Sequence, residues 1–132
     1  MSFSALWLDH HHATLFTFNK AQGKLDLSTV RTETIAADEP IEHQNRHPND
    51  VVHYVKEQAQ ISFFNKVTKK LERVNQLMVM GPGIAKSQFI HHCESLDNKE
   101  ISEAIMGVET LGTHMSYDEM IAKAESFFNS YS

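Results

Sequence analysis

Histidines stand out among the residues that could do chemistry, because the chain has nine of them in 132 residues. Most lie in three short clusters: His10–His12, His43 with His47, and His91, His92 and Cys93. Imidazole and thiolate are typical zinc ligands. His43 and His47 are four residues apart, so they would meet only in a helix, and Pro48 disfavours a helix there. A metal site at His43 and His47 is one hypothesis, and turn or surface histidines are the other.

Four basic residues form a second constellation: Lys66, Lys69, Lys70 and Arg73. Their spacing places them on one stripe if the segment is helical. Such a stripe can follow the phosphate backbone of an RNA. It can equally be a solvated face that complements the dipole at the C-terminal end of a helix. The sequence leaves both interpretations open.

A third candidate is Lys86, which follows the turn Gly81-Pro82-Gly83. The turn opens an expected helix, and helix N-termini attract anions, so Lys86 could reach a phosphate. The glycine spacing fits neither a P-loop nor a dinucleotide-binding fingerprint. The alternative is a tight turn in which glycine allows close packing.

Two catalytic chemistries fit poorly. Two-metal hydrolysis needs carboxylates that converge on a metal pair. Asp9 and Glu109 instead end strands that we expect two spacings, or about 10 Å, apart. Cys93 falls on an apolar helical stripe, so we expect it in the core and not as a nucleophile. The residues therefore favour a protein with neither catalytic activity nor a cofactor.

The composition is that of a globular, acidic protein, with 41% hydrophobic and 22% charged residues and a formal net charge of -5. An acidic chain is not built for non-specific nucleic-acid binding, which leaves only a local basic patch for that role. The single cysteine, Cys93, excludes an internal disulfide and suits a reducing cytosol. Neither a signal-peptide pattern nor an apolar stretch of about 20 residues is present. We therefore expect a cytoplasmic protein without membrane contact.

Apolar patterns predict five strands and three helices. The expected strands are Phe3–Leu8, Ala13–Phe18, Leu25–Ile35, Leu77–Met80 and Ala104–Val108. The expected helices are Asp50–Arg73, Ile84–Ser95 and one that Ser116 opens with a capping box. The order β-β-β-α-β-α-β-α predicts one α/β domain over residues 1–132. Its mixed five-stranded sheet is antiparallel in the front half and parallel in the back half.

This order is similar to that of the ribonuclease-H-like fold. Three segments resemble the middle domain of the archaeal and eukaryotic peptide-chain release factors: Leu6–Asp9 with Ala13–Leu15, Val79–Phe89, and Gly107–Thr110. The most specific of these is the Gly-Pro-Gly turn with its following helix. The resemblance covers nearly the whole chain, and stand-alone bacterial proteins of the translational machinery resemble it too.

The chain departs from that family in the loop Ala37–Pro48. Release factors carry Gly-Gly-Gln there, and the glycines let the backbone approach the peptidyl-tRNA ester. Here Gln44 is preceded by Glu42 and His43, which both bring side chains. Peptide release is therefore not expected.

The resemblance implies a non-catalytic, translation-associated module that binds the ribosome, a tRNA or a partner protein. The residues expected to make that contact are His43, Gln44, Arg46, Lys66, Lys69, Lys70, Arg73 and Lys86. One alternative is a metal-binding protein or small hydrolase that uses the histidine-rich loops. Another is an interaction protein outside translation, which could pair with a second copy of the chain.

Overall fold

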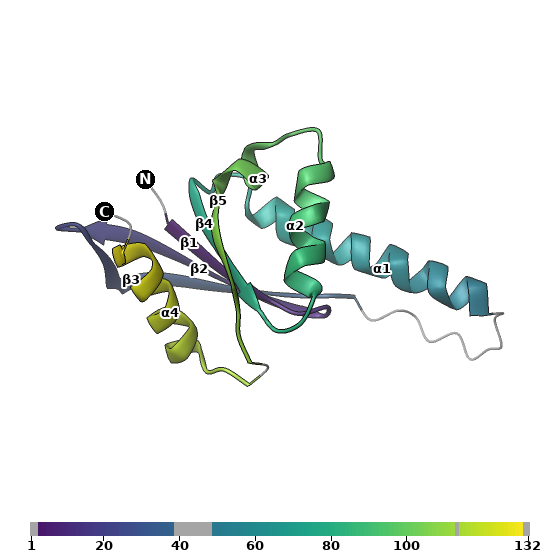
Figure 1. The fold of residues 1–132 in the computed structure, drawn as a ribbon, viewed down its shortest axis with the longest axis horizontal. Coiled ribbons are helices and arrows are strands. Elements are labelled where there is room, and N and C mark those ends of the chain that lie inside the picture. The colour runs from purple at the N-terminus through teal and green to yellow at the C-terminus, as the bar shows by residue number, and fades with distance from the viewer. Residues whose placement is uncertain (1–2, 39–48, 113, 131–132) are drawn as a thin grey trace.

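The computed structural model describes residues 3–38, 49–112 and 114–130, with the backbone alone for 49–56. Its strands are β1 (Phe3–Leu8), β2 (His12–Ala21), β3 (Lys24–Ala36), β4 (Gln76–Gly81) and β5 (Ile105–Thr110). Its helices are α1 (Asn49–Lys70), α2 (Ala85–Ser95), α3 (Glu100–Ala104) and α4 (Tyr117–Ser130). One sheet holds these strands in the order β3-β2-β1-β4-β5 (Figure 1). The predicted α/β fold with a mixed five-stranded sheet is confirmed.

Helix α3 is the one element that the sequence did not predict. We expected a turn there and a strand beginning at Ala104, whereas Ala104 ends α3 and the strand begins one residue later. The Asn98 side-chain oxygen accepts the Glu100 N–H at 2.9 Å, which starts the helix. A helix of five residues is too short to show a periodic apolar pattern.

The pairing of the strands follows the predicted division into two halves. Strands β1, β2 and β3 form an antiparallel meander, while β1 pairs with β4 and β4 with β5 in parallel. The turn between β2 and β3 has positive φ angles of 54° at Gln22 and 81° at Gly23. Turns of this hand match the twist of paired strands. The hairpin is therefore longer than predicted, because Asn19–Ala21 continue the pairing.

Each face of the sheet has its own apolar core. Along β1, Leu6 and Leu8 point to one face, and Ala5 and Trp7 point to the other. Helices α1, α2 and α3 cover the Leu6 face, and α4 covers the opposite face (Figure 1). The predicted capping box of α4 is confirmed. The Ser116 side-chain oxygen accepts the Glu119 N–H at 3.2 Å, and the Glu119 carboxylate accepts the Ser116 N–H at 3.2 Å.

The described side chains of helix α1 that are buried lie in its C-terminal half. Phe63, Val67 and Leu71 are buried on the predicted apolar stripe, although the helix ends at Lys70 and not at Arg73. Toward its N-terminus the helix runs out past the edge of the sheet (Figure 1). No helix among the described residues is long and apolar enough to span a membrane.

The turn after β4 needs glycine for a steric reason. Gly81 has a φ of 153°, and a Cβ there would lie 2.1 Å from the carbonyl oxygen of Leu8. The close approach of β1 to this turn is therefore open only to glycine. This confirms the close-packing interpretation for Gly81, whereas Gly83 is favoured by its positive φ of 61°.

Candidate functional site

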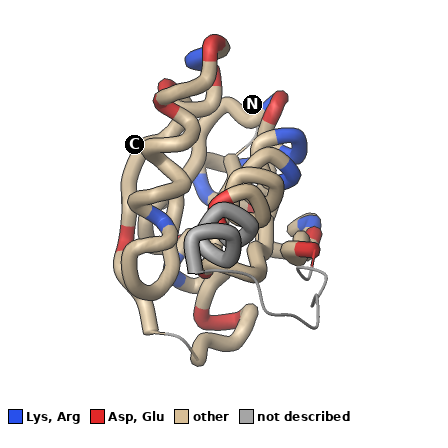
Figure 2. The backbone as a smooth tube through the Cα atoms, turned by 90° about the vertical axis from the view of Figure 1, so that its right-hand side faces the viewer, with Lys and Arg blue, Asp and Glu red and all other residues tan. Residues whose placement is uncertain are grey.

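The predicted basic stripe lies at the C-terminal end of α1, where Figure 2 shows the basic residues close together. The Lys66 ammonium is 2.7 Å from the Asp38 carboxylate, and the Lys70 ammonium is 3.3 Å from that of Glu33. These two lysines therefore fasten α1 to β3 and the residues that follow it. The side chains of both lysines and both acids are at least 40% exposed, so each ion pair contributes little to the stability of the fold.

Lys69 and Arg73 differ from the other two basic residues. Both are exposed, and neither has an ion-pair or hydrogen-bond partner within residues 3–38, 57–112 and 114–130. Arg73 lies in the turn after α1, so the helical stripe itself holds only the three lysines. The charges available to a partner at this end of α1 are mainly those of Lys69 and Arg73.

Lys86 is buried, with 6% of its surface exposed. Its ammonium donates a hydrogen bond back to the carbonyl oxygen of Gly83. Lys86 therefore closes its own turn, and contact with an anion would require the side chain to leave it. The predicted loop residues His43, Gln44, Arg46 and His47 lie outside the described residues, and their roles stay predictions.

The structure brings together two histidine clusters that are distant in sequence. His10, in the turn after β1, and His91 and His92, on α2, line one groove between that turn, α1 and α2. The groove has a volume of about 630 Å³. We call it the histidine groove. The described residues that line it are His10, Glu57, Gln60, Ile61, Phe64, Gln88, His91, His92 and Ser95.

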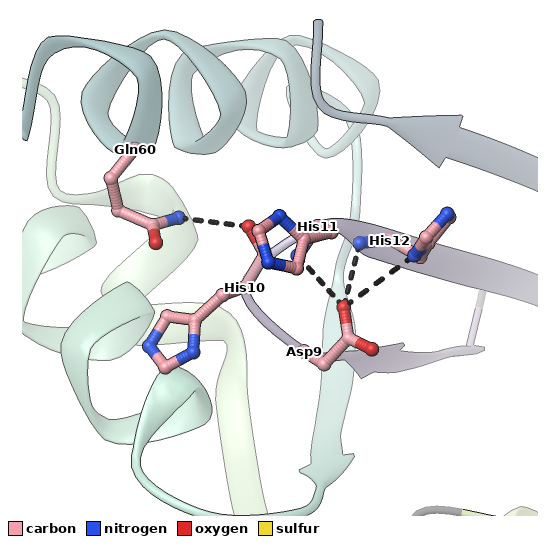
Figure 3. Close-up of polar contacts among 5 residues, drawn as sticks. All are labelled: Asp9, His10, His11, His12 and Gln60. Atoms are coloured by element: carbon pink, nitrogen blue, oxygen red, sulfur yellow. Dashed lines mark hydrogen bonds and ion pairs between the residues drawn. The ribbon is translucent and has the colours of Figure 1, made fainter. Parts of the chain in front are cut away.

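The turn that carries His10 is held by Asp9. The Asp9 carboxylate accepts the N–H groups of His11 at 2.8 Å and His12 at 2.7 Å. Figure 3 shows the result: the His10 ring points away from His12, while Gln60 of α1 reaches the His10 carbonyl at 3.4 Å. Asp9 is thus occupied in the turn, as expected for a hairpin residue.

Hydrogen bonds to amide side chains hold two of the three groove histidines. His10 Nε2 is 2.7 Å from Gln88 Oε1, and His92 Nε2 is 2.9 Å from Asn65 Oδ1. The His92 ring also packs on Phe64, at 5.6 Å between centroids. Burial lowers the pKa of His92, which favours its neutral form. His91 is exposed beside them.

The arrangement suits binding better than catalysis. Among the described residues, no group of three or more His, Cys, Asp or Glu side chains is placed to hold a metal ion. Burial, with a smaller contribution from Glu94, raises the pKa of Cys93 to about 12, so its thiol stays protonated and unreactive. As predicted, β4 lies between β1 and β5, which keeps Glu109 two strands away from the β1 end.

Comparison with solved structures identifies the fold. The chain superposes on the Pelota protein of Archaeoglobus fulgidus with a TM-score of 0.58 and 14% identity, over 98% of this chain and 34% of the other. For Thermoplasma acidophilum Pelota the TM-score is 0.56 with 14% identity, over 88% and 30%. For the archaeal translation termination factor aRF1 it is 0.58 with 17% identity, over 98% and 37%.

The fold is that of a release-factor or Pelota domain. The chain spans about a third of the length of each of these structures. No protein-family model matches the sequence, and no curated protein matches it either. The predicted resemblance to release factors is thus confirmed at the level of the fold.

The sequence missed the polar residues that complete the histidine groove. Neither Gln60 nor Gln88 belongs to a recognisable motif. On α1, the helical spacing of Gln60, Ile61 and Phe64 places these three residues on one side of the helix. A search for exposed amides one turn from the histidines of α2 would have found Gln88.

Proposed function

We propose that this protein is a non-catalytic binding module of the translation machinery, which contacts ribosomal or transfer RNA through the C-terminal end of α1. The observation that carries the proposal concerns Lys69 and Arg73 at the C-terminal end of α1. Both are exposed and have no ion-pair partner among the described side chains, although the chain has a net charge of -5. Two exposed cations near each other can make a local phosphate contact even on an acidic protein. Lys69 is the better placed of the two, because Glu72, Glu100 and Glu103 line one hollow together with Arg73.

The fold supports the same assignment. A translation termination factor has this fold, although similarity of fold does not by itself fix function. The segment Glu42-His43-Gln44 stands where the resemblance implies Gly-Gly-Gln, so the proposal concerns binding and not peptide release. The predicted contacts of His43, Gln44 and Arg46 belong to the same proposal.

The test is co-sedimentation with ribosomes at a series of salt concentrations. Replacing Lys69 and Arg73 with Glu should weaken association. It should also reduce the slope of log affinity against log salt by about 1 for each cation removed. The matched control is Lys123→Glu, an exposed charge reversal on α4, across the sheet.

The control variant should sediment like the unchanged protein. If the protein associates with neither ribosomes nor RNA at any salt concentration, the proposal is wrong. It is equally wrong if Lys123→Glu weakens association as much as the reversal at Lys69 and Arg73.

A further inference from the structure

We infer that the histidine groove is a pocket for an unpaired nucleobase of an RNA strand whose phosphates lie on the basic end of α1. The inference rests on the proposed function and adds a specific site to it. A volume of about 630 Å³ is in the range of small-ligand pockets.

The lining of the groove matches a flat heteroaromatic ring. The ring of His91 is exposed in the groove and that of His92 is partly exposed, and unpaired bases stack on such side chains. Phe64 is 4% exposed and supports the His92 ring from behind. Ile61 adds an apolar surface that is 44% exposed. Among the described residues that line the groove, Glu57 is the one acidic side chain, so their repulsion of a polyanion is limited.

Each of two side-chain amides in the groove has one hydrogen-bonding group engaged and the other available among the described residues. The available groups are a donor on Gln88 and an acceptor on Gln60. Gln88 gives its Oε1 to His10, which leaves its NH₂ without a partner among the described residues. Gln60 donates its Nε2 to the His10 carbonyl, which leaves its Oε1 likewise available in that part of the chain. One donor and one acceptor on the same groove are what the edge of a nucleobase requires.

The groove is continuous with the basic end of α1. Ile61 lines both the histidine groove and a smaller hollow of about 290 Å³ that Lys66 and Lys69 also line. Asn65, which binds His92, lines the same hollow. Ile61 and Lys69 are about 12 Å apart along the helix axis at 1.5 Å per residue. A strand with one base in the groove would therefore have its neighbouring phosphates beside the lysines.

A transition metal fits the groove less well than a base. His10 and His92 each use a ring nitrogen on an amide, so of the three groove histidines only His91 has both nitrogens available among the described residues. No third ligand of the His, Cys, Asp or Glu type converges with them there. Stacking and amide contacts need no such convergence.

The experiment measures binding of two probes by fluorescence anisotropy: a short single-stranded oligoadenylate and an abasic strand of the same length. His91→Ala with Gln88→Ala changes only exposed side chains, so the fold should persist. We expect this variant to lose about tenfold in affinity for oligoadenylate, because it removes the exposed ring on which the base stacks and one amide that contacts the base edge. Its affinity for the abasic strand and its salt slope should not change.

Two controls separate the base from the phosphates. His114→Ala removes an exposed histidine outside the groove and should leave both affinities unchanged. Lys69→Glu should weaken both probes equally and lower the salt slope by about 1. In the unchanged protein, the imidazole C–H resonances of His91 and His92 should shift on addition of oligoadenylate but not of the abasic strand.

The outcomes distinguish this inference from the proposed function. If both probes bind equally well, or if the groove variant weakens both in proportion, the base pocket is refuted while the phosphate contact stands. Binding of oligoadenylate that survives Lys69→Glu unchanged but fails in the groove variant would support the pocket and count against the phosphate contact. If neither probe binds and ribosomes do not either, both proposals are wrong.

Discussion

The two faces of the sheet are covered in different ways. Helix α4 alone covers one face, and Met120, Ala124 and Phe128 all lie buried against the sheet. Three helices cover the other face, yet α1 and α2 leave the histidine groove open between them. The α1 side therefore keeps a groove with a partly polar lining between its helices.

The α4 face is an interlocked aromatic layer. Phe128 contacts Phe3 and Phe127 edge to face, at 5.4 and 5.0 Å between centroids. Gly107 of β5 makes room for this layer, because a Cβ there would lie 2.5 Å from the Phe127 ring. The face therefore has little freedom to rearrange.

The largest expected effect comes from opening the α4 face. Phe128→Ala removes a ring that is 1% exposed and should cost about 3–5 kcal/mol of unfolding free energy. Urea denaturation measures it. The matched control is Ile61→Ala on the α1 side, where 44% exposure limits the loss to about 1 kcal/mol. Similar losses for the two variants would contradict the division of roles.

Overpacking the same face should have a smaller effect. Gly107→Ala forces the Phe127 ring to move, which should cost about 1–3 kcal/mol. The control is Gly112→Ala, where an added Cβ meets nothing within 4 Å. A Gly107→Ala protein as stable as the unchanged one would show that α4 fits the sheet loosely.

Removing the cap of α4 should cost less again. Ser116→Ala loses the side-chain bond to the Glu119 N–H, which is worth about 1 kcal/mol in other helices. Ser116→Thr keeps a hydroxyl that can accept the Glu119 N–H and donate to the Glu119 carboxylate, so it should restore most of the stability. Thermal unfolding of the two variants against the unchanged protein gives the comparison.

Sequence patterns predicted the fold because its central strands are unambiguous. β1 and β4 are short apolar runs that are buried on both faces. A glycine-rich turn precedes α2, and a capping box marks the start of α4. Local sequence patterns failed where a neighbouring strand decides whether a segment is extended. Asn19–Ala21 has no strand pattern and is extended because β3 lies beside it.

The histidine groove was beyond such reasoning for a related reason. Local patterns show that His10 lies in a turn and that His91 and His92 lie near the end of a helix. They cannot show that the β1–β4 pairing brings α2 next to that turn. The buried position of Lys86 was equally hidden, because its bond to Gly83 depends on the geometry of one turn.

The smallest expected effect is a pH dependence of stability, which tests whether the His92 ring is partly shielded from water. Burial lowers the pKa of His92 from its ordinary value of 6.5, so the unfolded chain binds a proton more readily than the folded one. The stability that neutral His92 contributes is present above pH 6.5 and is lost as pH falls through its folded pKa. Unfolding free energies of the unchanged protein and of His92→Gln, compared between pH 5 and 8, should therefore diverge on the acid side. An NMR titration of the His92 ring with a midpoint at or above 6.5 would show instead that water reaches the ring freely. The packing of His92 on Phe64 would then not shield it from solvent.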